Sequence, residues 1–276
     1  MENPARRLRD ACEPIAMHAV WSPTTQAALA ELGLDFLQAY VCGRGSALGD
    51  APSALVAATF AVFDPGLIDS AWSAHGDLAR LVRVRDDAAA ESLHLVLGDD
   101  QQEAVERVAG LLEDACANLH VTGRPLYAGL RARPRLTDPY ARLWRAADVV
   151  REHRGDCHIA VCVAAGLDPL RMNLLTELRA GYPVGEYSDT RGWPVTHREA
   201  ALTRLEADGL VADGQLTRTG REFRDGIEEA TDAAQEELVA ALGDAIEEVI
   251  VALNGWSARC IEGGTFPDDE RKRAAG

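Results

Sequence analysis

The hydrophobic and polar positions along this chain follow helical spacing over most of its length. In segments such as 52–62, 86–97 and 101–120, apolar residues recur every three or four positions, which is typical of helices that bury one face. Four capping residues stand directly before a proline, a pattern that favours a helix start because the first turn does not need the missing N–H. These starts are Ser22-Pro23, Asp64-Pro65, Asp138-Pro139 and Asp168-Pro169. The first 137 residues are therefore predicted to be all α.

The second half of the chain is also predicted to be helical, with one small exception. Helices are expected over 139–154, 221–242 and 244–261. Before the last two, the segment 210–217 contains two short strand-like runs separated by Asp213-Gly214, a pair typical of a tight hairpin turn. The predicted fold class is mostly α with a short β-hairpin.

The segment 196–225 joins a helix, the hairpin and a second helix. A capping box of Thr196 and Glu199 predicts the start of the first helix, and Gly209 stands where a left-handed residue would end it. The helix closes on L-x-x-x-G-L-V and the hairpin on L-T-x-x-G-R. This order resembles the recognition helix and wing of MarR-type winged-helix proteins, over roughly residues 139–242. The resulting organisation is an N-terminal helical domain over 1–137, a C-terminal winged-helix domain over 138–266 and a flexible tail over 267–276.

The resemblance implies that the winged helix binds DNA, while the local chemistry leaves a second interpretation open. The hairpin tip, 213–215, carries no cation, and a base-reading helix normally offers Arg, Lys, Asn or Gln on its outer face. Here that face is expected to centre on Ala200, Thr203 and Ala207. A scaffold or dimerisation element that does not bind DNA is the alternative. The phosphate contacts, if DNA is bound, would be Arg204, Arg218 and Arg221.

The chain is acidic overall, which works against binding to nucleic acid, but its acidic residues are concentrated in two regions. The chain carries 28 basic and 44 acidic residues, net −16, which works against binding to phosphate backbones and to anionic membranes. Counted by region, 1–123 carries −10 and 225–276 carries −9, whereas the recognition-like segment 196–224 is neutral and 124–154 carries +5. The acidity is therefore placed outside the segment that would meet DNA.

Cysteine usage and hydropathy predict a cytoplasmic protein. The six cysteines show no C-x-x-C pair and no regular spacing, which favours free thiols in a reducing compartment. No signal-like apolar segment follows the N-terminus, and no run approaches the length of a membrane span. We expect neither secretion nor membrane insertion.

The densest run of chemically capable residues is 151–158, which reads R-E-H-R-G-D-C-H. With L-W at 143–144, G-R-x-x-x-L-G at 43–49 and R-G-W at 191–193, this run resembles an uncharacterised group of actinobacterial helix-turn-helix proteins that carry an R-E-H-R-G-D-x-H stretch. That resemblance covers nearly the whole chain and implies no particular activity.

Three interpretations of this run stay open. In the first, Gly155 ends one helix and Asp156 caps the next. In the second, His153, Asp156 and His158 are polar anchors of a ligand pocket. In the third, two pairs spaced i,i+4 bind a transition metal if the helix continues. The pairs are His153 with Cys157 and His158 with Cys162.

Three further features complete the candidate chemistry. Arg44 needs either an interior carboxylate or an anionic ligand if it is buried. Trp193 is expected in core or interdomain packing, beside the pocket. Glu228 and Asp232 are like charges at i,i+4, expected on a solvated face unless one of them reaches the basic stretch at 151–154.

The function predicted from the sequence is a MarR-like, ligand-responsive transcription regulator with a small-molecule pocket between its two halves. Its expected partners are a small molecule and double-stranded DNA, and it is expected to form a homodimer through its long terminal helices. No cofactor, resident metal or catalytic residue is assigned. The alternative is a winged-helix scaffold that has lost DNA binding and acts as a small-molecule-binding protein or as an enzyme using His153, Asp156 and His158. The predicted ligand-binding residues are Arg44, His153, Asp156, His158 and Trp193.

Overall fold

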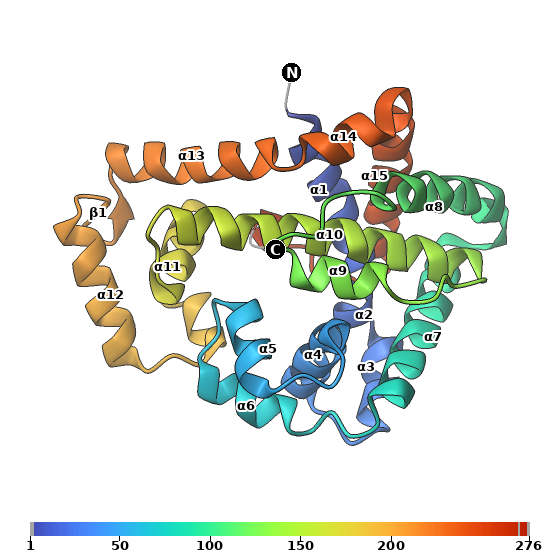
Figure 1. Cartoon of the computed structure of the whole chain (residues 1–276), viewed down its shortest axis with the longest axis horizontal. Coiled ribbons are helices and arrows are strands. Elements are labelled where there is room, and N and C mark those ends of the chain that lie inside the picture. Colours follow the sequence, from blue (N-terminus) through green and yellow to red (C-terminus); the bar gives the residue numbers. More distant parts are fainter. Residues whose placement is uncertain (1–2, 270, 275–276) are drawn as a thin grey trace.

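The computed structural model of this chain describes residues 3–269 and 271–274 and is mostly α with one short hairpin, as predicted (Figure 1). The longer helices are α1 (Pro4–Ala16), α3 (Pro23–Ala30), α4 (Phe36–Gly45), α5 (Ser53–Phe60), α6 (Pro65–Trp72), α7 (Leu78–Leu97), α8 (Gln102–Cys116), α9 (Pro125–Arg131), α10 (Pro139–Ala164), α11 (Pro169–Arg179), α12 (Val195–Ala207), α13 (Arg218–Ala233), α14 (Glu236–Leu242) and α15 (Ile246–Glu262). The shorter elements are α2 (His18–Trp21), α16 (Arg271–Ala274), the 3-10 turns η1 (Ser46–Leu48), η2 (Asp99–Gln101), η3 (Ser188–Arg191) and η4 (Gly243–Ala245), and the strands β1 (Val211–Ala212) and β2 (Gln215–Leu216).

The predicted helix starts are confirmed where a capping residue precedes a proline. The carboxylates of Asp64, Asp138 and Asp168 each accept hydrogen bonds from backbone N–H groups of the first turn. Ser22 also precedes its helix, but its hydroxyl bonds the hydroxyl of Ser92 at 2.6 Å and makes no cap. Local sequence therefore defines these helix starts, even when the side chain of the capping residue is used elsewhere.

The capping box predicted at Thr196 and Glu199 is wrong. Helix α12 begins two residues earlier than that box requires, at Val195, with Pro194 at the capping position and no side-chain cap. Proline fixes φ near −60°, and here its extended ψ of 140° already sets the break in the chain before Val195. The predicted end of this helix is confirmed, because Gly209 has the left-handed φ of +70°.

Helix α10 is longer than predicted, and the interpretation of Gly155 as a helix end with Asp156 as the next cap is wrong. The helix continues through both residues to Ala164. Glycine weakens a helix interior by only about 1 kcal/mol, and packing of buried neighbours outweighs such a cost. Glu152, His153 and Arg154 on one side of Gly155 are all buried, as is Asp156 on the other.

The end of the chain also differs from the pattern-based expectation. The helix predicted over 221–242 is divided into α13 and α14, with the break at buried Gln235. The hairpin is confirmed: Val211 pairs with Leu216 and Ala212 with Gln215, and Asp213 and Gly214 both have positive φ. Of the tail predicted over 267–276, residues 270, 275 and 276 lie outside the described residues.

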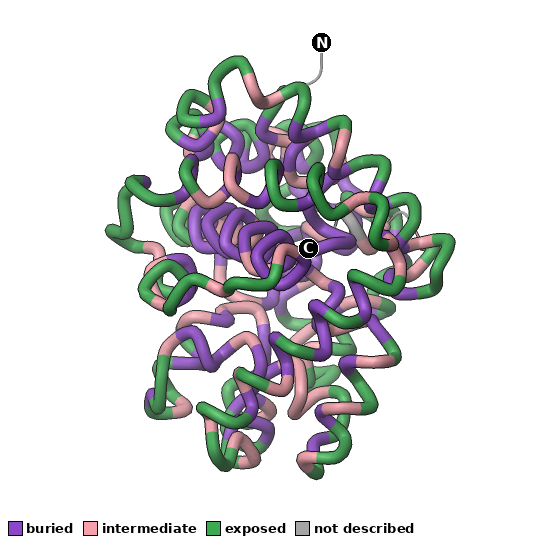
Figure 2. The backbone as a smooth tube through the Cα atoms, turned by 90° about the vertical axis from the view of Figure 1, so that its right-hand side faces the viewer, coloured by how far each residue is buried: buried purple, intermediate pink, exposed green. Residues whose placement is uncertain are grey.

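The described residues form two hydrophobic cores that share α10. The larger core contains α1 to α9, the first half of α10 and the helices α14 and α15. The smaller core joins Cys162 near the end of α10 to α11, α12, the hairpin and α13. Figure 2 shows α10 nearly along its axis, buried at the centre of the molecule. Helix α10 therefore contributes side chains to both cores.

Two further predictions concern cysteines and membrane spans. All six cysteines are free, as predicted, and all are buried. Among the described residues, no single helix is long and apolar enough to cross a membrane, and only the pair α10 and α11, bent by 112°, reaches that length and composition together.

Candidate functional site

A cavity of about 510 Å³ lies where the two cores meet, which is within the usual size range of small-molecule sites. Its walls come from α1, α4 and α5 of the larger core, from α11, η3 and α13 beside the smaller core, and from the second half of α10. About half of the lining residues are apolar or aromatic, and polar or charged side chains, among them several arginines, make up most of the rest. The aromatic lining residues are Trp21, Phe36, Tyr40, Phe60, Phe63 and Tyr187.

The structure brings together three of the five predicted ligand-binding residues. Arg44, Asp156 and His158 line the cavity, although α4 and α10 are far apart in the sequence. The other two do not line it. His153 is fully buried behind the wall, and its Nδ1 lies 2.8 Å from Oε1 of Gln235, while Trp193 packs on the smaller core and donates its indole N–H to the carbonyl of Val62 at 2.9 Å.

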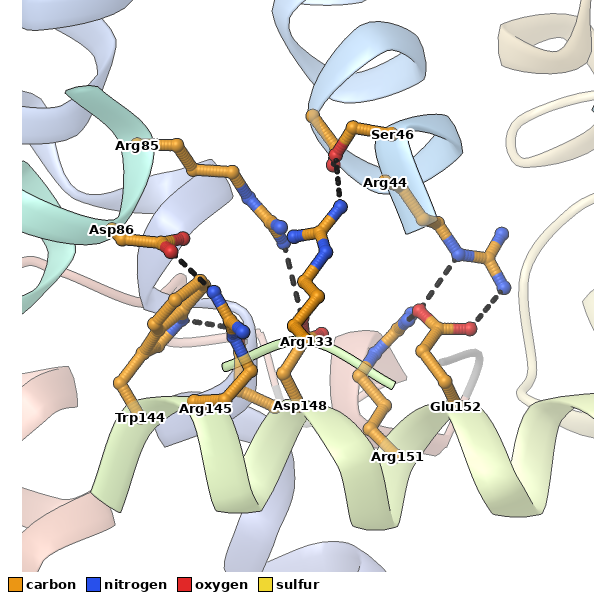
Figure 3. A network of polar contacts seen from close by, with 12 residues as sticks. Arg44, Ser46, Arg85, Asp86, Arg133, Trp144, Arg145, Asp148, Arg151 and Glu152 are labelled. Atoms are coloured by element: carbon orange, nitrogen blue, oxygen red, sulfur yellow. Dashed lines mark hydrogen bonds and ion pairs between the residues drawn. The ribbon is translucent and has the colours of Figure 1, made fainter. Parts of the chain in front are cut away.

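Arg44 is held by an interior carboxylate, one of its two predicted arrangements. Its Nε and Nη2 donate to the two oxygens of Glu152, each at 2.8 Å, and its guanidinium lies 4.7 Å from the ring centre of Phe60 (Figure 3). Glu152 also accepts from Arg151 at 2.7 Å. Burial raises the pKa of Glu152, but the two guanidiniums outweigh burial and lower it to about 2. The carboxylate is therefore charged over the whole physiological range.

Figure 3 shows that this pair is one end of a polar row along α10. Toward the start of the helix, Arg145 pairs with Asp86 of α7, and Asp148 accepts from Arg85 of α7 at 3.2 Å. Arg133 reaches in from the segment after α9 and donates to the hydroxyl of Ser46 at 2.9 Å. These contacts join elements that are distant in sequence, so no local motif could have predicted them.

A second polar cluster corrects the prediction that Glu228 and Asp232 lie on a solvated face. Both carboxylates are buried on α13, and Arg154 of α10 bridges them at 3.0 and 2.8 Å. Arg224 pairs with Glu228 at 2.7 Å. Although burial raises the pKa of Glu228, Arg224 leads the groups that lower it to about 2. The predicted reach of α13 to the basic stretch is thus confirmed at Arg154, because one guanidinium relieves the repulsion between two like charges.

His158 and Cys162 lie on one face of α10, as the i,i+4 spacing requires. The Nδ1 of His158 lies 3.1 Å from the hydroxyl of Thr231, and its Nε2 lies 3.6 Å from the sulfur of Cys162. Burial lowers the pKa of His158 to about 4 and raises that of Cys162 to about 11, so the pair is a neutral imidazole and a thiol at neutral pH. Within residues 3–269 and 271–274, no group of three or more His, Cys, Asp or Glu side chains is placed to hold a metal ion.

Asp156 is a carboxyl group of the cavity lining whose pKa lies near neutral. Its carboxylate accepts from the backbone N–H of Tyr127 at 3.0 Å. Burial is the main reason that its pKa is raised to about 7, and the nearby carboxylate of Glu152 adds to the shift. A carboxyl group that gains or loses its proton near neutral pH therefore faces the space where a ligand would lie.

Most of the cavity residues escaped the sequence-based prediction, and two of them, Tyr40 and Arg191, matter for its chemistry. Tyr40 lies one helical turn before Arg44 on α4, and its hydroxyl accepts from Nη1 of Arg44 at 3.4 Å. Arg191 was noted only as part of the R-G-W motif, yet its side chain lines the cavity. The i,i+4 spacing of Tyr40 and Arg44 was the available signal for the first, whereas nothing local distinguished Arg191 from a surface arginine.

The face predicted to meet DNA is exposed, and its centre carries small, uncharged side chains. Ala200, Thr203 and Ala207 of α12 are exposed, as expected. The predicted phosphate contacts are also on the surface, and each has a partner within the chain: Arg204 pairs with Asp168 at 3.2 Å, Arg218 with Glu222 at 2.7 Å, and Arg221 donates to the carbonyl of Leu216 at 2.6 Å.

Comparison with known proteins identifies the family of the chain. Residues 5–267 match the model of a helix-turn-helix family, so the chain belongs to that family, whose scaffold is that of DNA-binding regulators. No curated protein and no solved structure matches the chain. The match extends over both cores and the cavity, well beyond the helix–hairpin–helix segment.

Proposed function

We propose that this helix-turn-helix protein is a MarR-like, ligand-responsive transcription regulator of the cytoplasm. In this proposal, a small molecule in the central cavity changes how the winged helix meets double-stranded DNA. The observation that carries it is the position of the cavity, whose walls belong to both cores. A ligand that prefers one arrangement of these walls shifts the population of that arrangement.

The segment 191–193 supplies a direct connection from the cavity to α12. The side chain of Arg191 lines the cavity, and its carbonyl accepts from the N–H of Asp64 at 2.9 Å. Trp193, two residues later, is bound to the carbonyl of Val62, and α12 begins at Val195. A ligand that moves Arg191 would therefore act on the N-terminal end of the helix that the fold offers to DNA.

Selection from a random double-stranded DNA library, followed by titration of binding against salt, tests the DNA part of the proposal. We expect binding at about 50 mM salt. The magnitude of the slope of log K against log salt concentration should decrease by roughly one for each phosphate contact removed. The variants are Arg204→Ala, Arg218→Ala and Arg221→Ala, singly and combined. Arg107→Ala on α8, outside the winged helix, is the matched control and should leave the slope unchanged. Absence of any selected or non-specific binding at that salt concentration contradicts the proposal.

We also propose that the protein acts as a homodimer. Operators read by helix-turn-helix proteins are commonly two half-sites, and a dimer presents two reading helices to them. The long terminal helices remain the proposed contact. On α15, Val251 is an apolar side chain that is 67% exposed. Light scattering coupled to size exclusion tests this, and Val251→Asp should shift a dimer toward monomer. A monomer at micromolar concentration contradicts it.

The second candidate function is a small-molecule-binding protein, or an enzyme, on a scaffold that no longer binds DNA. The observation in its favour is the plain outer face of α12, together with a hairpin tip whose residues 213–215 include no cation. Ligand binding that persists while every DNA fragment fails to bind would select this candidate over the regulator. In an enzyme, Asp156 would be the group suited to proton transfer, because its pKa lies near neutral.

A further inference from the structure

Arg191 differs from the other arginines of the cavity in having no carboxylate partner. Arg44, Arg151 and Arg154 each form an ion pair with an acidic side chain. No described carboxylate lies within 4 Å of Arg191, its Nε has no hydrogen-bond partner among the described residues, and its Nη1 donates to the hydroxyl of Thr190 at 3.0 Å. A guanidinium stays charged at every physiological pH, so this one lacks a counterion.

Aromatic rings hold this guanidinium in place at the cavity wall. It lies 4.6 Å from the ring centre of Phe63 and 4.2 Å from that of Tyr187. Stacking on two rings fixes the plane of the guanidinium, and leaves its edge, where the N–H groups lie, for hydrogen bonds. The arrangement resembles that of an arginine prepared to receive a planar anion such as a carboxylate.

Tyr40 also packs beside Phe63. The two rings are 5.7 Å apart, and both line the cavity. The hydroxyl accepts from Arg44, while no described residue accepts its proton, so it can donate to a ligand. Although burial raises the pKa of Tyr40, the surrounding guanidiniums, led by that of Arg44, lower it below its ordinary value. The space around Phe63 is therefore electropositive.

The remainder of the cavity favours a large apolar group. The lining also includes the rings of Trp21 and Phe36, whose centres are 5.4 Å apart, and the side chains of Leu37 and Ile159. A volume of about 510 Å³ fits a drug-sized molecule, most of whose surface would be covered by these apolar walls.

We propose that the cavity binds an amphipathic monoanion, whose carboxylate lies between the guanidinium of Arg191 and the hydroxyl of Tyr40 while its apolar body fills the aromatic part. This inference rests on the proposed ligand-binding role of the cavity and specifies the class of ligand. The carboxylate supplies the counterion that Arg191 lacks, and bidentate pairing with a stacked guanidinium is among the strongest charge-assisted contacts in proteins. Since Arg191 leads into α12, the same contact would couple the ligand to the winged helix.

A matched pair of fluorescent probes tests the proposal on the full chain. 1-Pyrenebutyrate and 1-pyrenebutanol share one aromatic body and differ in whether the end group is charged. We expect the acid to bind at least about 10-fold more tightly than the alcohol, as measured by fluorescence titration at pH 7.5. Equal affinities, or binding of neither probe, would overturn the proposal.

Variants then assign the preference to the proposed residues. Arg191→Met keeps a long apolar stem. It should reduce the preference in affinity for the acid over the alcohol to less than about 3-fold. Tyr40→Phe, a milder change, should weaken the acid by about 3-fold and leave the alcohol unaffected. Arg83→Met on α7, an exposed arginine outside the cavity lining, should retain the full ratio, and thermal melting checks that each variant is folded. A ratio that survives Arg191→Met contradicts the assignment.

The same probes separate this proposal from the regulator proposal. DNA binding is measured first without a probe, and then with saturating 1-pyrenebutyrate. DNA binding that the acid leaves unchanged would contradict ligand-responsive regulation, while the charge preference of the cavity would still stand. A lost charge preference would contradict the carboxylate site alone.

Discussion

The wall of the central cavity and the outer face of α12 lie in one protein and offer very different chemistry. The cavity gathers arginines, aromatic rings and a titratable carboxyl group, whereas the outer face of α12 presents alanine and threonine. Helix-turn-helix proteins normally place their most specific side chains on the second of these surfaces. Here the family determines the scaffold, and the residues that could confer specificity are concentrated inside it.

The difference follows from what each region must hold together. Where the cores meet, carboxylates and guanidiniums are removed from water and need one another, so α10 is lined by ion pairs to α1, α4, α7 and α13. Side chains on the outer face of α12 are exposed and have no such constraint. A cation in the first region without a carboxylate partner among the described residues, as Arg191 is, therefore carries more information than an arginine on the surface.

The first prediction tests whether ion pairs hold the junction. Glu152→Gln removes the charge that Arg44 and Arg151 share, and leaves two guanidiniums with a neutral amide in a buried position. We expect the free energy of unfolding, measured by urea titration, to fall by about 3–5 kcal/mol. Glu247→Gln, which alters an exposed pair with Arg7, should give little change. Equal effects of the two variants would show that burial adds nothing to the pairs of the junction.

The second prediction uses the carboxyl group of the cavity wall. Because the pKa of Asp156 is raised to about 7, well above its value in an unfolded chain, the folded state binds a proton that the unfolded state releases at a lower pH. Its contribution to stability is complete below about pH 4 and is lost as the pH rises to about 7. Asp156→Asn removes this dependence and keeps an oxygen for the N–H of Tyr127.

We therefore expect Asp156→Asn to gain stability relative to the natural protein between pH 4 and pH 8, by about 4 kcal/mol. Urea titrations of both proteins at several pH values measure the difference, in which the titration of all other groups cancels. A difference that stays constant with pH would show that Asp156 titrates normally, and that the wall carries no proton near neutral pH.

The third prediction concerns the connection between cavity and α12. Gly192 has a φ of +81°, and a Cβ atom there would lie 2.8 Å from the side chain of Leu67 on α6. Gly192→Ala should cost about 2 kcal/mol, from the left-handed conformation and the contact together. Gly209→Ala is the matched control: its φ is +70° with nothing nearby, so it should cost about 1 kcal/mol. Equal costs would show that the segment 191–193 is free to move away from α6.

Local signals in the sequence predicted local features well. The capping carboxylates of Asp64, Asp138 and Asp168 and the turn at Asp213-Gly214 depend on neighbours within a few positions, and the structure has all four. Gly155 failed as a helix end because burial on both sides outweighs its weak helix propensity.

The candidate site depended on contacts that no local pattern encodes. Arg44 and Glu152 are 108 residues apart, and the sequence indicated only that a buried Arg44 needs an acid or an anion. The sequence predicted a solvated face for Glu228 and Asp232, because the guanidinium that pairs with both comes from another helix, α10. Arg191 could not be distinguished, because what sets it apart is the absence of a described carboxylate near it in space. The predicted division into 1–137 and 138–266 stays a prediction.

The length of α10 has a consequence for how such proteins exchange parts. This uninterrupted helix supplies side chains to the larger core at Trp144 and to the smaller core at Cys162. A recombination that transferred only the winged helix to another protein would carry half of α10 with no partner for its buried face, or leave that half behind. We therefore expect the hairpin-bearing module and the cavity to be inherited together.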